Sequence, residues 1–135
     1  MYLLDTNVVS ELRRNKPHGA VIAWLNSTPA DQIFLSAVTL GELQAGIELT
    51  RRQDLAKASQ IEIWLDQVAE SYQILPLDGQ ILREWARLMH GRPDRLIEDA
   101  LLAATARIHR LTLVTRNVRD FQTFDVSLLD PFAKP

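Results

Sequence analysis

Short, mostly apolar runs alternate along the chain with longer segments in which apolar residues recur at helical spacing. The short runs predict buried strands of the parallel type, at 2–4, 33–35, 73–75, 111–114 and 127–129. The helical spacing predicts helices over 8–14, 18–27, 37–50, 53–71, 78–90 and 98–108. This alternation predicts a three-layer α/β/α sandwich on a mainly parallel sheet. The length of 135 residues indicates that 1–135 is one domain.

The first polar residues stand directly after the first predicted strand. Asp5, Thr6 and Asn7 follow Leu4, and helical spacing resumes at Val8. In an open parallel sheet, ligands bind beyond the carboxyl ends of the strands, so we expect Asp5 to point into a binding crevice. The alternative is that Asp5 or Thr6 only caps the next helix.

Glu42 is the second acid of interest, on the helix predicted over 37–50. At 100° per residue, Val38, Ala45 and Leu49 lie within about 60° of it, which predicts that Glu42 projects from the inward face. We expect it in the first turn of its helix, near the same edge of the sheet. An unpaired carboxylate there is costly and needs a partner. The alternative is a Glu that bonds to neighbouring backbone or reaches the rim.

The third acid, Asp99, opens a helix that is apolar on nearly every side. A favourable interaction with the helix dipole alone explains acids at both Glu98 and Asp99. Further along the chain, the strand at 111–114 leads into Thr115, Asn117 and Asp120. Asn117 with Asp120 three residues later is also typical of a capping arrangement.

These polar clusters are expected to meet at one edge of the sheet. Two carboxylates about 4 Å apart repel by roughly 4 kcal/mol at an effective dielectric constant of 20, so a group of them requires protonation or a cation. The chain has no Cys and only three His. A site of oxygen ligands therefore predicts Mg²⁺ or Mn²⁺. The chemistry that follows most directly from such a site is hydrolysis of a phosphodiester.

Composition adds two expectations. The net charge of −2 does not by itself indicate nucleic-acid binding. However, 12 of the 15 basic residues are Arg, whose guanidinium is the side chain best suited to bidentate contacts with phosphate. With no N-terminal apolar segment and no run of 18 apolar residues, we expect no signal peptide, no membrane span and a cytoplasmic location.

Four segments carry a family resemblance. They are LLDTN at 3–7, LSAVTLGEL at 35–43, DALLAAT at 99–105 and LVTRNVRDF at 113–121. In this order, from residue 2 to about 130, they resemble the four motifs of the PIN domain, and more narrowly the VapC and FitB type of toxin ribonuclease. The resemblance implies a Mg²⁺-dependent endoribonuclease with RNA as substrate, a small antitoxin as partner and a homodimeric state.

The resemblance also implies roles for individual residues. The catalytic and metal-binding acids would be Asp5, Glu42, Asp99 and Asp120. The side chains that hold the carboxylates and waters in place would be Thr6, Asn7, Thr115 and Asn117. Arg116 would touch the scissile phosphate. Whether Asn117 or Asp120 completes the acidic site, and whether one or two ions bind, stays open at this point.

One rival from a different functional class is a PIN-like domain that has lost catalysis and binds only RNA or a protein. The presence of all the acids argues against it. A haloacid dehalogenase phosphatase would need an acid where Asn7 stands, and a P-loop or dinucleotide-binding protein would need a glycine fingerprint, which is absent.

Overall fold

The computed structural model describes residues 1–133, and its centre is a parallel five-stranded sheet in the order β3-β2-β1-β4-β5. The strands are β1 (Tyr2–Leu4), β2 (Ile33–Ser36), β3 (Gln73–Leu75), β4 (Thr112–Val114) and β5 (Leu128–Leu129). β1 is the central strand, paired in register with β2 on one side and β4 on the other. The carboxyl ends of these strands therefore form one common edge.

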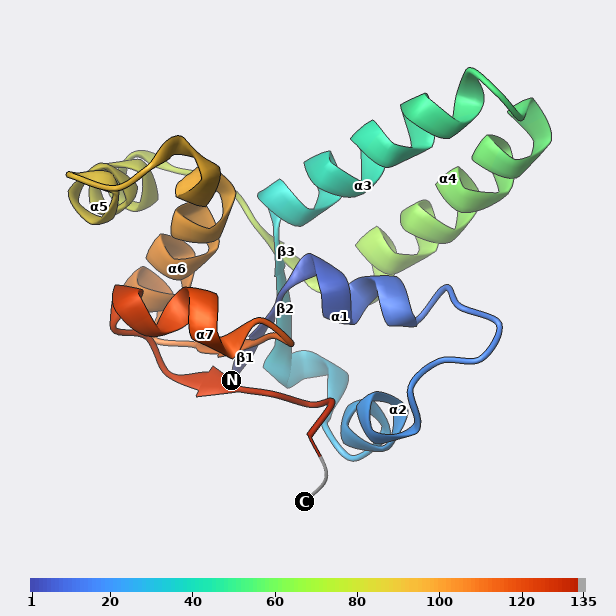
Figure 1. Ribbon diagram of the computed structural model, residues 1–135. Helices are drawn as coiled ribbons and strands as arrows, with labels where there is room; N and C mark the ends of the chain where they lie inside the picture. The colour runs from blue at the N-terminus through green and yellow to red at the C-terminus, as the bar shows by residue number, and fades with distance from the viewer. Residues whose placement is uncertain (134–135) are drawn as a thin grey trace.

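Seven α-helices surround the sheet within the described residues (Figure 1). They are α1 (Thr6–Glu11), α2 (Gly19–Asn26), α3 (Ala37–Arg51), α4 (Leu55–Ser71), α5 (Gly79–Met89), α6 (Ile97–His109) and α7 (Val118–Phe121). Short 3-10 turns cover Ala30–Gln32, Asp94–Leu96 and Gln122–Phe124. None of the helices in this part of the chain has the length and apolar character needed to cross a membrane.

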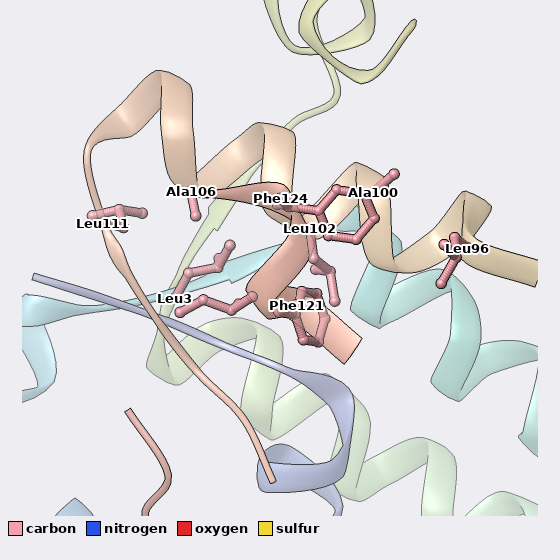
Figure 2. Packing of buried hydrophobic residues seen from close by; sticks show 10 residues of the cluster. Leu3, Leu96, Ala100, Leu102, Ala106, Leu111, Phe121 and Phe124 are labelled. Atoms are coloured by element: carbon pink, nitrogen blue, oxygen red, sulfur yellow. The ribbon is translucent and has the colours of Figure 1, made fainter. Parts of the chain in front are cut away.

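The two faces of the sheet carry separate cores, which accounts for the three layers. Leu3 points to the face covered by α5, α6 and α7, where it packs with Leu102, Phe121 and Phe124 (Figure 2). The next residue, Leu4, points to the opposite face, where α1, α2 and α4 supply further apolar residues such as Val8. Alternate strand residues thus enter opposite cores, as the pleat requires. The predicted α/β/α sandwich is confirmed.

Helices α3 and α4 form a hairpin that extends away from the sheet (Figure 1). Their contact has its own small core of Ile47, Ala58 and Leu65. The inward face of α3 is therefore set by α4. Residues Ala45 and Leu49, predicted to face inward with Glu42, are exposed, and that part of the prediction is wrong.

Polar caps fix where several helices begin. Asp5 accepts a hydrogen bond from Thr6 N, so α1 starts at Thr6 and ends at Glu11, earlier than the predicted 8–14. Ser36 caps α3 and Asp78 caps α5 through side-chain hydrogen bonds, as expected from their positions. The α1 cap places Asp5 directly between the central strand and the first helix.

Candidate active site

Asp5 lies at the carboxyl end of β1 and is only 6 % exposed. Its carboxylate accepts three hydrogen bonds: Thr6 N at 2.7 Å, Thr115 Oγ1 at 2.8 Å and Asn7 Nδ2 at 3.2 Å. Burial raises its pKa, and the hydrogen bonds from Thr115, Thr6 and Asn7 lower it, with a net rise. The capping interpretation of Asp5 holds, because its side chain accepts from Thr6 N at the start of α1, and its place in a binding crevice stays a prediction.

Thr6 connects this strand end to α3. Its Oγ1 lies 3.1 Å from Thr39 Oγ1 and 3.3 Å from Glu42 Oε1. A hydroxyl has one proton, so Thr6 donates to one of these oxygens at a time. The contact holds the Glu42 carboxylate on the side of α3 that faces β1.

Glu42 is half-buried at the sixth position of α3, in the second turn rather than the predicted first. Burial raises its pKa to about 7, with smaller contributions from the negative charges of Glu98 and Asp5. Its inward placement comes from the contact with Thr6 and the approach of α6. The exposed Ala45 and Leu49 do not supply it.

Asp99 is the third residue of α6, in the first turn as predicted, and it is half-buried. Its pKa is raised to about 6, first by burial and then by the charges of Asp5, Asp120 and Glu98, while Arg95 lowers it. Asp99 and Glu42 thus each lie close enough to Asp5 for its negative charge to raise their pKa values. Residues 5, 42 and 99, far apart in the sequence, meet at one edge of the sheet.

The segment after β4 completes this edge. Thr115 is fully buried, and its Oγ1 donates to Asp5 Oδ2 and accepts from Asn117 N at 2.9 Å. Asn117 precedes α7 without a side-chain cap bond, so the capping interpretation of Asn117 is wrong. Asp120 brings a charge that reaches Asp99, which the neutral Asn117 side chain cannot do.

Arg116 does not point its guanidinium at the acids. Its side chain stacks on the ring of Phe132, 4.6 Å from the centroid, while its backbone N donates to Asn7 Oδ1 at 3.3 Å. Phe132 in turn packs edge-on against His18. In this arrangement Arg116 links the C-terminal segment to the loop before α2.

Glu98 also acts on this site, although the sequence suggested no role for it beyond the helix dipole. It is exposed, yet its charge is the largest electrostatic contribution to the raised pKa of Glu42, and it also acts on Asp99. Its place beside Asp99 in the first turn of α6 was visible in the sequence. The helix dipole explained it equally well, so it carried no separate signal.

The donor set fits a hard divalent cation. Every group is an oxygen, and no Lys or Arg in residues 1–133 forms an ion pair with Asp5, Glu42 or Asp99. However, within the same residues no three His, Cys, Asp or Glu side chains are gathered into a set of metal ligands. Binding an ion there would require the carboxylates to move toward one another.

Comparisons with known proteins agree with this geometry. The family model of the PIN domain matches residues 2–126. Toxin FitB of Neisseria gonorrhoeae is 33 % identical over 143 positions, covering 98 % of this chain and 99 % of that protein. VapC ribonuclease Y4jK of Sinorhizobium fredii is 31 % identical, covering 98 % of each. The crystal structure of FitAcB from Neisseria gonorrhoeae superposes with a TM-score of 0.87 at 34 % identity, covering 98 % of this chain and 99 % of that one.

Proposed function

Because this chain belongs to the PIN domain family, we propose that it is a metal-dependent endoribonuclease and the toxin of a toxin–antitoxin pair. Similar proteins that cover nearly all of the chain are named Toxin FitB and VapC ribonuclease. The rival function, a domain that only binds RNA or protein, would not need a group of buried acids.

The proposal rests on one observation: three carboxylates lie close enough to affect one another, and no Lys or Arg in residues 1–133 forms an ion pair with any of them. Asp5, Glu42 and Asp99 all have raised pKa values, and burial is the first cause of each rise. Keeping such charges together lowers the stability of the metal-free protein. This loss of stability is expected of a nuclease that needs a divalent ion, because the bound ion would neutralise the repulsion between the carboxylates.

Four residues are proposed to hold the ion: Asp5, Glu42, Asp99 and Asp120. Mg²⁺ is the proposed ion, with Mn²⁺ as the substitute, because the donors are hard oxygens. When bound, the ion supplies charge that stabilises a phosphodiester under attack and acidifies the attacking water. Glu98 is expected to add negative charge at the rim of the same pocket.

The neighbouring polar residues are proposed to position the acids. Thr115 and Asn7 donate to the same Asp5 oxygen, Oδ2, and so fix the direction of its carboxylate. Asn117 donates to Thr115 through its backbone, and Thr6 fixes Glu42. These bonds restrict the rotamers of Asp5 and Glu42, so less side-chain entropy would be lost when the carboxylates move toward an ion.

Arg116 is proposed to contact the scissile phosphate. To reach it, the guanidinium would have to leave the ring of Phe132. The exchange is feasible because a stacked, exposed Arg gains only about 0.5–1 kcal/mol.

The remaining parts of the proposal concern assembly and location. Two similar solved structures are titled as a toxin-antitoxin complex from Klebsiella pneumoniae and as VapBC-1 from nontypeable Haemophilus influenzae, which supports a small antitoxin as the partner of this chain. We propose that residues 1–135 act as one domain, in the cytoplasm, as a homodimer. The exposed Leu49, Leu55 and Ile63 on the α3–α4 hairpin are the surface proposed for the second copy.

The direct test is cleavage of a mixed, single-stranded RNA pool by the purified chain in Mg²⁺ and in EDTA. We expect cleavage only with Mg²⁺, and a loss of several orders of magnitude in Asp5→Ala and Asp99→Ala. Circular dichroism should show that both variants stay folded. Asp78→Ala, which loses the cap of α5 and has no hydrogen bond or ion pair with Asp5, Glu42 or Asp99, is the matched control and should retain cleavage.

Two results would contradict the proposal. Cleavage that persists in Asp5→Ala would point to a contaminating nuclease. A folded wild-type chain that binds RNA but leaves it intact in both Mg²⁺ and Mn²⁺ would favour the binding domain that has lost catalysis.

A further inference from the structure

A cleft of about 840 Å³ lies away from the acids, at the other end of α1. One wall is the loop of residues 12–15, and the other is the first half of α4, including Lys57, Ile61 and Trp64. The lining of the cleft includes both apolar and charged side chains. The cleft is large enough for a segment of a macromolecule.

The charge of this cleft is opposite to that of the acidic site. Arg13, Arg14 and Lys57 contribute three positive charges and Asp54 one negative charge, so the lining carries +2. Arg14 is paired with Glu11 at 3.0 Å. Arg13 and Lys57 are exposed, and neither forms an ion pair with another residue in 1–133. Two cations at this cleft are therefore available to an anion.

The wall of residues 12–15 is held in place by a buried acid. Glu11 is only 5 % exposed, and its carboxylate accepts from His18 N at 2.9 Å and from Arg14 Nη1 at 3.0 Å. These contacts close the loop across residues 11–18 and lower the pKa of Glu11, which therefore stays charged. The basic wall is thus a defined part of the fold.

The position of the cleft relative to the acids matters for a polyanion. α1 begins beside Asp5 and leads toward the loop with Arg13 (Figure 1). The six residues of α1 at 1.5 Å each give about 9 Å along the helix axis. A few nucleotides of a single strand cover a distance of this order. One strand of nucleic acid can therefore reach both places.

We infer that this cleft binds the phosphate backbone of the RNA strand, a few nucleotides from the bond that the acidic site cuts. The inference rests on the proposed function and names where its substrate is held. The acidic site repels a polyanion, and Arg116 stacks on Phe132 in this structure, so further cations are needed to attract the strand. Arg13 and Lys57 supply it, and Trp64 offers an aromatic side chain beside which a base can stack.

An acidic protein segment is the other occupant that a basic, partly apolar cleft could take. RNA is favoured because the two cations that are unpaired within residues 1–133, Arg13 and Lys57, match a phosphate backbone in charge, and the short helix α1 is all that separates this cleft from Asp5.

The test compares Arg13→Ala/Lys57→Ala with a control double variant, Arg83→Ala/Arg87→Ala, which removes the same charge from α5. Fluorescence anisotropy measures binding of a labelled 12-nucleotide single-stranded RNA in EDTA, so that no cleavage occurs, over a range of salt concentrations. Losing two phosphate contacts reduces the slope of log affinity against log salt by about 1.4. At about 0.1 M salt this equals a roughly 25-fold weaker binding.

The expected result is this loss in the cleft variant and a change of less than about threefold in the control. Equal loss in both would overturn the inference, because bulk charge would then account for it. An unchanged affinity in the cleft variant would also overturn it.

A labelled poly-Glu peptide tests the other occupant. Peptide binding that depends on Arg13 and Lys57, together with unchanged RNA affinity, would assign the cleft to a protein partner. Cleavage of RNA by wild-type protein in Mg²⁺ is measured in parallel, so failure of the cleft inference is distinguishable from failure of the proposed nuclease function.

Discussion

Thr115 Oγ1 donates a hydrogen bond of 2.8 Å to Asp5 Oδ2, and both residues are buried although 110 positions separate them in the sequence. The bond joins the carboxyl ends of the neighbouring strands β1 and β4. It also accounts for part of the direction in which the Asp5 carboxylate points. This contact therefore positions Asp5, the most buried of the acids proposed to hold an ion.

Thr115→Val tests that contact with almost no change in shape. Removing the donor leaves Asp5 Oδ2 with a single side-chain partner, Asn7, and we expect unfolding to become easier by about 1–2 kcal/mol. The pKa of Asp5 should rise further, because the bond from Thr115 lowers it. Thermal unfolding and carbonyl-detected NMR titration measure the two effects.

Thr105→Val is the matched control. Thr105 is equally buried, but its hydroxyl donates to Leu101 O inside α6 and touches none of the acids. Its loss should change stability by less than about 1 kcal/mol and leave Asp5 unaffected. Equal effects of both substitutions on the pKa of Asp5 would show that the hydrogen bond is not what matters.

The stability of the metal-free protein should depend on pH in an unusual direction. The pKa of Glu42 is raised from 4.5 to about 7 and that of Asp99 from 3.8 to about 6, so the folded protein disfavours their ionised forms. Their contribution to stability is fully present below the ordinary pKa values and is lost as the pH rises through 6 and 7. In EDTA, the melting temperature should fall between about pH 5 and pH 8.

Mg²⁺ should reverse this trend, and the size of its effect should itself depend on pH. We expect a larger rise in melting temperature at about pH 8 than at about pH 5, because protonated carboxylates bind the ion poorly. Differential scanning fluorimetry with and without Mg²⁺ measures it. A Mg²⁺ effect of the same size at both pH values would indicate binding somewhere else.

Asp99→Asn should stabilise the metal-free protein. The substitution keeps the shape and removes a half-buried charge that Asp5, Asp120 and Glu98 repel. After allowance for solvent screening we expect a gain of about 1 kcal/mol at neutral pH, together with loss of RNA cleavage. Urea unfolding in EDTA measures the gain, and a destabilised Asp99→Asn would mean that the charge is already compensated.

Glu11→Gln tests the wall of the basic cleft. Gln keeps one acceptor for His18 N but loses the charge that pairs with Arg14, so we expect a loss of about 1 kcal/mol. Glu48→Gln on the exposed side of α3 is the control and should have little effect. Thermal unfolding measures the loss, and an unchanged melting temperature in Glu11→Gln would contradict this role.

Much of the fold follows from local patterns. The short apolar runs form strands, and those at the centre of the sheet are buried between helices, where Leu3 and Leu4 alternate between the two faces. The caps at Ser36 and Asp78 were visible in the sequence for the same reason, since a cap depends only on residues three or fewer positions away. Local chemistry of this kind does not depend on the rest of the molecule.

What the sequence could not predict depends on partners far along the chain. The inward face of α3 is decided by α4, so Ala45 and Leu49 are exposed although they share a side with Glu42. The stacking of Arg116 on Phe132 depends on where the C-terminal segment runs. Glu98 was given no role at the site because an acid in a first helical turn already has a local explanation.

The central claim is that Asp5, Glu42 and Asp99 share a divalent ion, and Mn²⁺ titration followed by electron paramagnetic resonance tests it most directly. The signal of free Mn²⁺ reports how much ion the folded protein removes from solution. We predict saturable binding by the wild-type chain at about pH 8 and at least about tenfold weaker binding by a folded Asp5→Asn variant. Binding of equal strength by both proteins, or no binding by the wild type, would contradict the account.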